Sequence, residues 1–284
     1  MKCIFVSDLH GNINHFRKLF EIIEHEKPDG VFIGGDILPN QFLIKGDIKK
    51  FLEEEFFNPI KKVRITIDKA IRFFVIMGND DPKIFEKLFI NSDKKKIIDY
   101  IHFKTVKFND FFVTGYSFVP PTPFQLKDWE RYDVSRFVDV GVLSPEEGHR
   151  TTKVSKDITC YSTISQDLEK LTKNSQLEKT IFIFHSPPYN SNLDKADLEG
   201  KMVDHAPVDV HVGSIAIKRF IEKKQPFLTL HGHVHETVRL TGEWKERRGK
   251  TFSFSAAHDG IELAVIRFDT NDLEKASREI IKTS

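Results

Sequence analysis

The chain has 284 residues, of which 39% are hydrophobic and 30% are charged, and its formal net charge is +1. These values are typical of a water-soluble globular protein, and the small net charge argues against a global field that would recruit nucleic acid or an anionic membrane. No apolar run approaches the length of a membrane span. The two cysteines, Cys3 and Cys160, form no disulfide framework, and the N-terminus lacks the charged-then-apolar pattern of a signal peptide. We therefore expect a cytoplasmic protein without a membrane partner.

The N-terminal part of the chain alternates strands with a helix. Residues 2–6 form an apolar run of strand type, and residues 13–25 place apolar side chains at helical spacing, with Asn12 suited to cap the helix. A second short, buried strand covers residues 30–34. Strand, helix and strand in this order predict a right-handed parallel crossover.

The next segment is less regular. Residues 38–40 predict a loop, and residues 47–57 carry a helical mixture of acidic residues and Phe. Pro59 should break that helix, because proline lacks the backbone N–H that a helix interior needs.

The rest of the chain mixes strands with helices. Expected strands cover residues 72–77, 98–118 (as pairs), 180–184, 227–230, 237–241, 251–256 and 261–268. Expected helices cover residues 82–89, 163–173 and 214–224, and a last helix follows Asn271, with Leu273, Ala276 and Ile280 on one face.

Residues 119–160 read as irregular, with a run of prolines followed by aromatic and basic residues. A long irregular stretch inside a compact domain is usually functional or disordered, and the aromatic content favours order. Since no linker or repeat interrupts the chain, we expect one domain over residues 1–284, in which 119–160 is an insertion that could act as a lid.

Polar residues follow five of the expected strands, and most of these clusters contain glycine. In open α/β sheets, loops at the carboxyl ends of strands gather into one site, and glycine lets the backbone turn sharply there. The clusters supply carboxylates, imidazoles and one amide, which are ligands for divalent metals. The candidate ligands are Asp8, His10, Asp36, Asn79, His185, His231 and His233.

Taken in order, the motifs D-x-H, G-D, G-N, H and G-H-x-H resemble the calcineurin-like metallophosphoesterase superfamily. The likeness runs from residue 3 to about residue 268 and is greatest to a prokaryotic branch related to cyclic-nucleotide phosphodiesterases. The resemblance implies an α/β fold, a four-layer αββα sandwich of two mixed β-sheets.

The resemblance also implies two divalent cations with Asp36 between them. Asp8, His10 and His233 would complete one cation site, and Asn79, His185 and His231 the other. Mixed nitrogen and oxygen ligands suit Mn, Fe, Zn, Co or Ni better than Ca, and Mn²⁺ is the first expectation. Two cations about 3.5–4 Å apart would hold a metal-bridging hydroxide as nucleophile and stabilise the charge that develops on phosphorus oxygens. We expect His235 and His211 to play structural or supporting roles.

One position departs from the family pattern. Many members carry a histidine after the asparagine of the third motif, where it serves as general acid, but this chain has Asp80. An aspartate of ordinary pKa is ionised at neutral pH and donates a proton poorly. Asp80 is therefore either a weak catalytic acid or a cap for the helix that begins at Pro82.

The sequence predicts a dimetal-dependent phosphoesterase that hydrolyses phosphodiester or phosphomonoester bonds of small molecules or nucleotides. Candidate substrate contacts are Asn12, Lys127, Arg131 and Tyr189, with Trp129 and Arg150 also in the irregular segment, although that segment could equally be a solvated loop. Two alternatives are a nuclease of the same superfamily, which the low net charge does not favour, and a non-catalytic scaffold that retains the fold. Retention of all seven candidate ligands argues against a scaffold.

Overall fold

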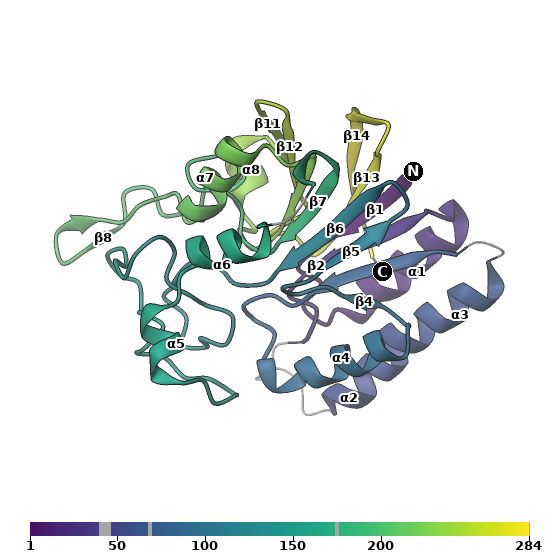
Figure 1. The fold of residues 1–284 in the computed structure, drawn as a ribbon, viewed down its shortest axis with the longest axis horizontal. Coiled ribbons are helices and arrows are strands. Elements are labelled where there is room, and N and C mark those ends of the chain that lie inside the picture. Colours follow the sequence, from purple (N-terminus) through teal and green to yellow (C-terminus); the bar gives the residue numbers. More distant parts are fainter. Residues whose placement is uncertain (40–46, 68–69, 174–175, 284) are drawn as a thin grey trace.

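Two six-stranded β-sheets pack face to face, and helices cover their outer faces (Figure 1). The computed structural model describes residues 1–39, 47–67, 70–173 and 176–283. The predicted loop at 38–40 therefore lies partly outside the described residues, at Asn40. The predicted four-layer αββα sandwich is confirmed. None of the helices in the described part of the chain is both long enough and apolar enough to cross a bilayer.

The first sheet is built from the N-terminal strands and the C-terminal hairpin. Its order is β14 (Asp272–Ile281), β13 (Leu263–Asp269), β1 (Lys2–Val6), β2 (Gly30–Gly34), β3 (Arg72–Ile76) and β4 (Asp99–Tyr100). Strands β1 to β4 are parallel, and β13 pairs antiparallel with β1 and with β14. The helical elements of this half are α1 (Ile13–Glu26), α2 (Ile48–Phe51), the π-helical turn η1 (Leu52–Phe57), α3 (Asn58–Thr66), the 3₁₀ turn η2 (Lys83–Phe85) and α4 (Glu86–Lys94).

The second sheet is also mixed. Its order is β11 (Lys245–Arg248), β12 (Thr251–Ser255), β10 (Leu228–His231), β7 (Thr180–Phe184), β6 (Phe111–Tyr116) and β5 (Thr105–Phe108). The four central strands are parallel, and each edge strand is antiparallel to its neighbour. The remaining elements are α5 (Lys156–Tyr161), α6 (Ile164–Leu171), the 3₁₀ turn η3 (Leu177–Lys179), the hairpin β8 (Met202–Val203) and β9 (Ala206–Pro207), α7 (Ile215–Lys224) and α8 (Thr237–Thr241).

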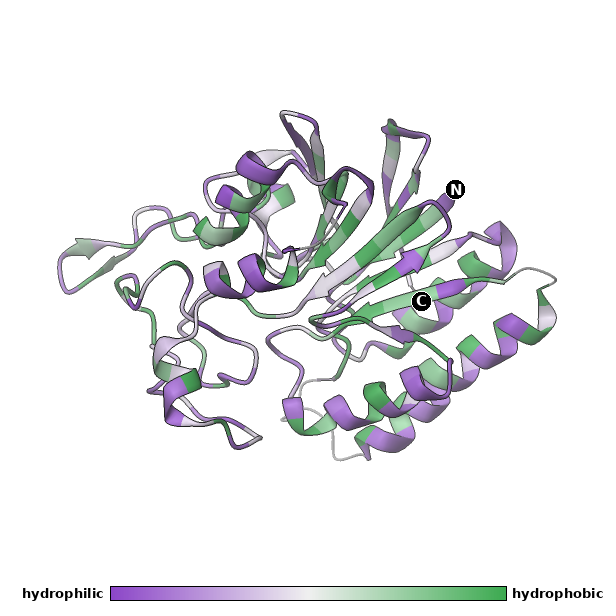
Figure 2. Cartoon of the chain, in the orientation of Figure 1, coloured by the Kyte–Doolittle hydropathy of each residue, from purple (hydrophilic) through white to green (hydrophobic). Residues whose placement is uncertain are grey.

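The core between the sheets is aromatic. The Phe32 ring on β2 lies 5.0 Å from that of Phe74 on β3 and 6.1 Å from that of Phe108 on β5, centroid to centroid. Phe32 therefore ties the first sheet to the second. Figure 2 shows the result along the chain, with hydrophobic strands in the interior and hydrophilic faces on the outer helices.

Three local predictions were wrong, each for a different reason. Pro59 does not end the helical segment, because η1 widens the preceding turn and Pro59 then falls in the first turn of α3, where its missing N–H leaves no bond unmade. Residues 237–241 form α8 and not a strand, and Gly242, in the left-handed region, ends it by donating its N–H to Val238.

The predicted last helix is instead strand β14. The register passes from Arg267 opposite Ser277 to Asp269 opposite Asp272, so residues 273–276 of β14 lie opposite the single residue Phe268. This irregularity lets Leu273 and Ala276, three residues apart, both turn toward the core. The spacing of Leu273 and Ala276 therefore matches one face of a helix, although the segment is a strand that pairs with β13.

Replacement of the central core aromatic should be costly. We expect Phe32→Ala to lower the free energy of unfolding by about 3–5 kcal/mol, because it leaves a cavity between the two sheets. The control is Ile65→Ala on α3, where the side chain is 85% exposed and the change should stay within about 0.5 kcal/mol. Urea denaturation measures both, and equal losses in the two variants would contradict this account of the core.

Candidate metal centre

The loops after β1, β2 and β3 meet the loops after β7 and β10 at one end of the two sheets. Backbone hydrogen bonds join the loops: Asp8 donates its N–H to the Gly35 carbonyl at 3.0 Å, and His10 donates to the Asp36 carbonyl at 2.8 Å. In the second sheet, Gly232 donates to the His185 carbonyl at 2.9 Å. Parallel strands thus bring motifs that are far apart in sequence to a shared edge, as the sequence predicts.

The backbone at this edge is strained. Asp8, His10, Asp36 and His233 all have positive φ angles, of 57°, 43°, 50° and 73°. Non-glycine residues seldom adopt this region, and such strain collects at functional sites. Gly78 serves a different purpose, because a Cβ at this position would lie 2.2 Å from Oδ1 of Asp36.

One group of side chains forms around the ends of β1 and β2. Asp8, His10, Asp36 and His235 each offer a ligand atom, and these atoms all lie within 4.8 Å of one another. The Nε2 atoms of His10 and His235 are 3.2 Å apart, and Nε2 of His235 is 3.6 Å from Oδ1 of Asp8. This spacing suits several donors around one cation.

A second group shares Asp36 with the first. Nε2 of His185 lies 3.2 Å from Oδ2 of Asp36 and 3.0 Å from Oδ1 of Asn79. The other ring nitrogen of His185 donates to the Gly34 carbonyl at 2.7 Å, which orients Nε2 toward the group. The ring of His233 lies 5.2 Å from that of His185, centroid to centroid.

The carboxylates and imidazoles of the two groups shift each other's pKa values. Burial opposes protonation of His185, but Asp36 outweighs it and raises the pKa of His185 to about 10. Burial also opposes protonation of His235, and Asp8 raises its pKa to about 9. Burial alone would raise the pKa of Asp8 and Asp36, yet the neighbouring imidazoles lower both, so two ionised carboxylates attract positive charge here.

His231 is not part of either group, which corrects the prediction for this residue. Its Nδ1 lies 2.9 Å from the Ser186 carbonyl and its Nε2 lies 2.8 Å from the hydroxyl of Thr229, so both ring nitrogens have protein partners. His235, expected to be a supporting residue, lies in the first group, and His233 lies beside His185 in the second. The signal was present in the sequence, because the G-H-x-H order begins at Gly232 and its histidines are therefore His233 and His235.

Asp80 lies at the open side of the groups. Its Oδ2 is 3.9 Å from Nδ1 of His10, its side chain is 51% exposed, and its N–H donates to Oδ1 of Asp36 at 2.8 Å. The charge of Asp36, together with burial, raises the pKa of Asp80 to about 6. The alternative prediction, that Asp80 caps a helix beginning at Pro82, is wrong. The helical turn η2 begins after Pro82 and has no side-chain cap.

Two of the predicted substrate contacts are committed to other bonds. Oδ1 of Asn12 accepts hydrogen bonds from the N–H groups of Asn14 and His15, which is the predicted helix cap. The hydroxyl of Tyr189 donates to Asp209 at 2.7 Å.

Lys127 and Trp129, both candidate substrate contacts, are buried in the irregular segment. The side chains of Lys127 and Glu130 are both 0% exposed and pair at 2.6 Å. Nε1 of Trp129 donates to the Asp81 carbonyl at 2.7 Å. Arg131 pairs with Asp167 and lies over the ring of Phe118. The segment is therefore packed against the third motif and holds one short helix, α5.

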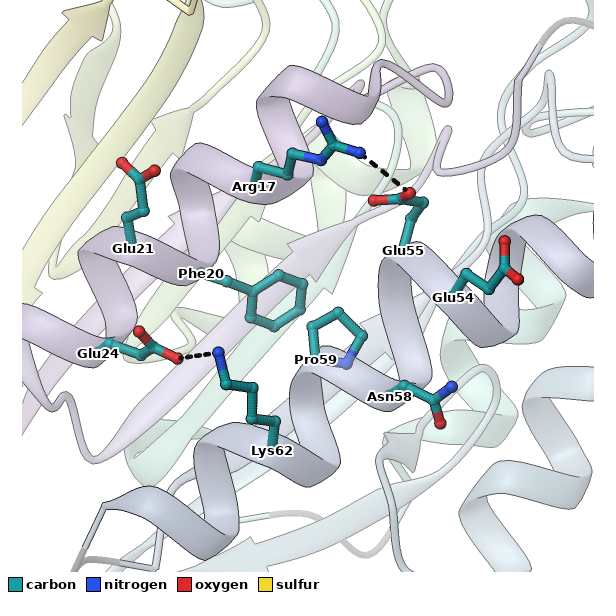
Figure 3. Close-up of a pocket in the computed structure, with 9 residues that line it drawn as sticks. All are labelled: Arg17, Phe20, Glu21, Glu24, Glu54, Glu55, Asn58, Pro59 and Lys62. Carbon is teal, nitrogen blue, oxygen red and sulfur yellow. Dashed lines mark ion pairs between the residues drawn. The ribbon is translucent and has the colours of Figure 1, made fainter.

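Two surface pockets lie outside the metal-ligand groups. The larger, of about 530 Å³, is a groove between α1 and the η1–α3 segment, where Glu24 pairs with Lys62 and Arg17 with Glu55 (Figure 3). The smaller, of about 350 Å³, lies between η2 and the irregular segment. None of the seven predicted ligands lines either pocket.

A model of the calcineurin-like phosphoesterase family matches residues 1–237. The chain belongs to the calcineurin-like phosphoesterase family. Its fold resembles that of the protein TT1561 of Thermus thermophilus, with a TM-score of 0.62 and 14% identity over 99% of both chains. It also resembles a dimetal phosphatase from Danio rerio, with a TM-score of 0.56 and 11% identity over 100% of this chain and 99% of that one. No curated protein matches the sequence.

The buried Lys127–Glu130 pair provides a test of how the irregular segment is held. We expect Glu130→Ala to lower the free energy of unfolding by about 3–5 kcal/mol, because it leaves a buried ammonium group without its partner. The double variant Lys127→Met/Glu130→Gln removes the charge and keeps an acceptor for Thr122, so it should recover most of that loss in thermal or urea denaturation. A neutral Glu130→Ala, or a double variant as unstable as the single one, would contradict this assignment.

Proposed function

We propose that this protein is a dimetal-dependent phosphoesterase that hydrolyses phosphodiester or phosphomonoester bonds. The observation that carries the proposal is the position of Asp36, a buried carboxylate that faces both groups of donors. Two cations placed close together repel each other, and a carboxylate between them offsets that repulsion.

The donor chemistry supports two cation sites. We assign Asp8, His10 and His235 to one site and Asn79, His185 and His233 to the other, with Asp36 common to both. Burial lowers the pKa of His233 to about 3, so its ring is neutral and has a lone pair for a cation. Asp36 and Asp8 raise the pKa of His185 and His235, so these two rings would each release a proton when a cation binds. Two carboxylates, four imidazoles and one amide suit Mn²⁺, or Fe, Zn, Ni or Co, better than Ca²⁺.

When bound, the cations would supply an activated water and the positive charge that the reaction needs. The protein supplies orientation: the Gly34 carbonyl fixes the His185 ring, and the linked loops hold Asp8 and Asp36 in strained backbone positions. Preorganised donors of this kind stabilise developing charge without rearrangement during the reaction.

Asp80, next to His10 and Asp36, is the residue that we propose as the general acid. Its raised pKa, of about 6, favours proton donation, but cations beside Asp36 would lower it again. We therefore propose esters with leaving groups of low pKa, which need little help from an acid, as the preferred substrates. The Danio rerio structure supports phosphatase chemistry on this fold, and no observation favours a nuclease.

Metal content distinguishes the two histidines of the revised ligand set. We expect His235→Gln to reduce bound metal from about two ions per chain toward one, whereas His231→Gln, a matched change, should lower thermal stability and keep both ions. Elemental analysis of the purified variants measures this. Metal loss in His231→Gln with retention in His235→Gln would reverse the assignment, and metal-free wild type would favour a non-catalytic scaffold.

Hydrolysis of bis-p-nitrophenyl phosphate and p-nitrophenyl phosphate with added Mn²⁺ tests the activity itself. Asp36→Ala should abolish both the activity and the metal, because it removes the carboxylate that the two sites share. Absence of hydrolysis by wild type with any of the five metals, or activity retained in Asp36→Ala, would reject the proposed function.

A further inference from the structure

The smaller pocket is lined in part by Lys83, which follows the third motif in the chain. It has a volume of about 350 Å³ and lies between η2 and the irregular segment. Four cationic side chains line it: Lys83, Arg131, Arg150 and Lys153. Small-molecule sites in proteins begin at about this size, so the pocket has room for more than a single ion.

The two carboxylates of the pocket, Asp128 and Glu130, offset only part of this positive charge. Asp128 accepts hydrogen bonds from the N–H of Lys83 and from the N–H and hydroxyl of Thr151. Glu130 forms an ion pair with Lys127 and accepts hydrogen bonds from the N–H and hydroxyl of Thr122. Both acids are thereby bonded within the protein, and both are buried.

Three of the cations keep their charge available. Arg131 pairs with Asp167. Arg150 donates to the carbonyls of Lys127 and Pro145. Within the described residues, no carboxylate lies at ion-pair distance from Lys83, Arg150 or Lys153. The pocket therefore holds positive charge in excess of its carboxylates.

Lys83 is held in an unusual environment. Its ammonium lies 4.2 Å from the ring centroid of Trp129 and 5.2 Å from that of Phe118. Burial, with Arg131 and Arg150 nearby, lowers the pKa of Lys83 below its usual value. A bound anion would relieve this repulsion, and the two aromatic rings preorganise the ammonium at the pocket wall.

We propose that this cationic pocket, defined by Lys83, Arg131, Arg150 and Lys153, binds the phosphate of a phosphorylated small molecule. Phosphate matches the charge and the donors, since arginine and lysine form charge-assisted hydrogen bonds to it. The site is separate from the candidate metal centre, since none of the candidate metal ligands lines the pocket.

The chain contains a built-in reporter for this site. Its two tryptophans are Trp129 and Trp244. Trp129 lies beside Lys83, whereas Trp244 packs against Phe254 in the second sheet. In the Trp244→Phe variant of the full chain, emission therefore comes from Trp129 alone, and a phosphate bound at Lys83 should change it.

Titration with inorganic phosphate at constant ionic strength is the test. We expect a saturable change in Trp129 emission, with an affinity reduced about ten-fold or more by Lys83→Gln, because a charge-assisted contact is lost. Lys153→Gln should also weaken binding. Because Lys153 is exposed, this substitution should not disturb folding. The control Lys62→Gln, in the groove between α1 and the η1–α3 segment, should leave the affinity for phosphate unchanged.

Two outcomes would overturn the proposal. One is emission that does not respond to phosphate at tens of millimolar beyond the effect of sodium chloride. The other is a response whose midpoint is the same in Lys83→Gln, Lys153→Gln and Lys62→Gln, which would place the bound phosphate at the metal centre or elsewhere.

Discussion

The carboxylate of Asp36 is the interaction on which the site depends. It is buried, it lies 3.2 Å from the His185 ring nitrogen, and it also faces His10. A buried carboxylate is costly unless positive groups surround it, and here the neighbouring imidazoles lower its pKa and keep it ionised. Gly35 and Gly78 have no Cβ atoms, and this leaves the space that the arrangement requires.

The second and third motifs are held together by a further buried acid. Asp81 accepts hydrogen bonds from the N–H groups of Ile37, Leu38 and Gly78. Its own carbonyl accepts the indole N–H of Trp129 from the irregular segment. The segment that the sequence suggested as a lid is therefore anchored to the back of the third-motif loop, and the proposed phosphate pocket opens between the two.

The fold and most of the candidate site follow from the sequence because both rest on local signals. Short apolar strands ending in glycine and polar residues predicted the converging loops, and the order of motifs predicted the family. Side-chain direction was less accessible. His231 is the last residue of β10 and turns into the protein, whereas His233 and His235 follow the strand. The two-residue spacing of the histidines does not separate these cases, but the order of the G-H-x-H motif, which begins at Gly232, does.

Other errors arose where tertiary contacts override local pattern. β14 became a strand because it pairs with β13, although its apolar residues have helical spacing. Lys127 reads as a surface cation in sequence, but Glu130 three residues later lets it be buried.

The most direct test of the central claim is anomalous scattering from crystals grown with Mn²⁺. The account predicts two peaks about 3.5–4 Å apart, with Asp36 between them and His235 on one of them. A single peak, no peak, or ligation by His231 in place of His235 would contradict it.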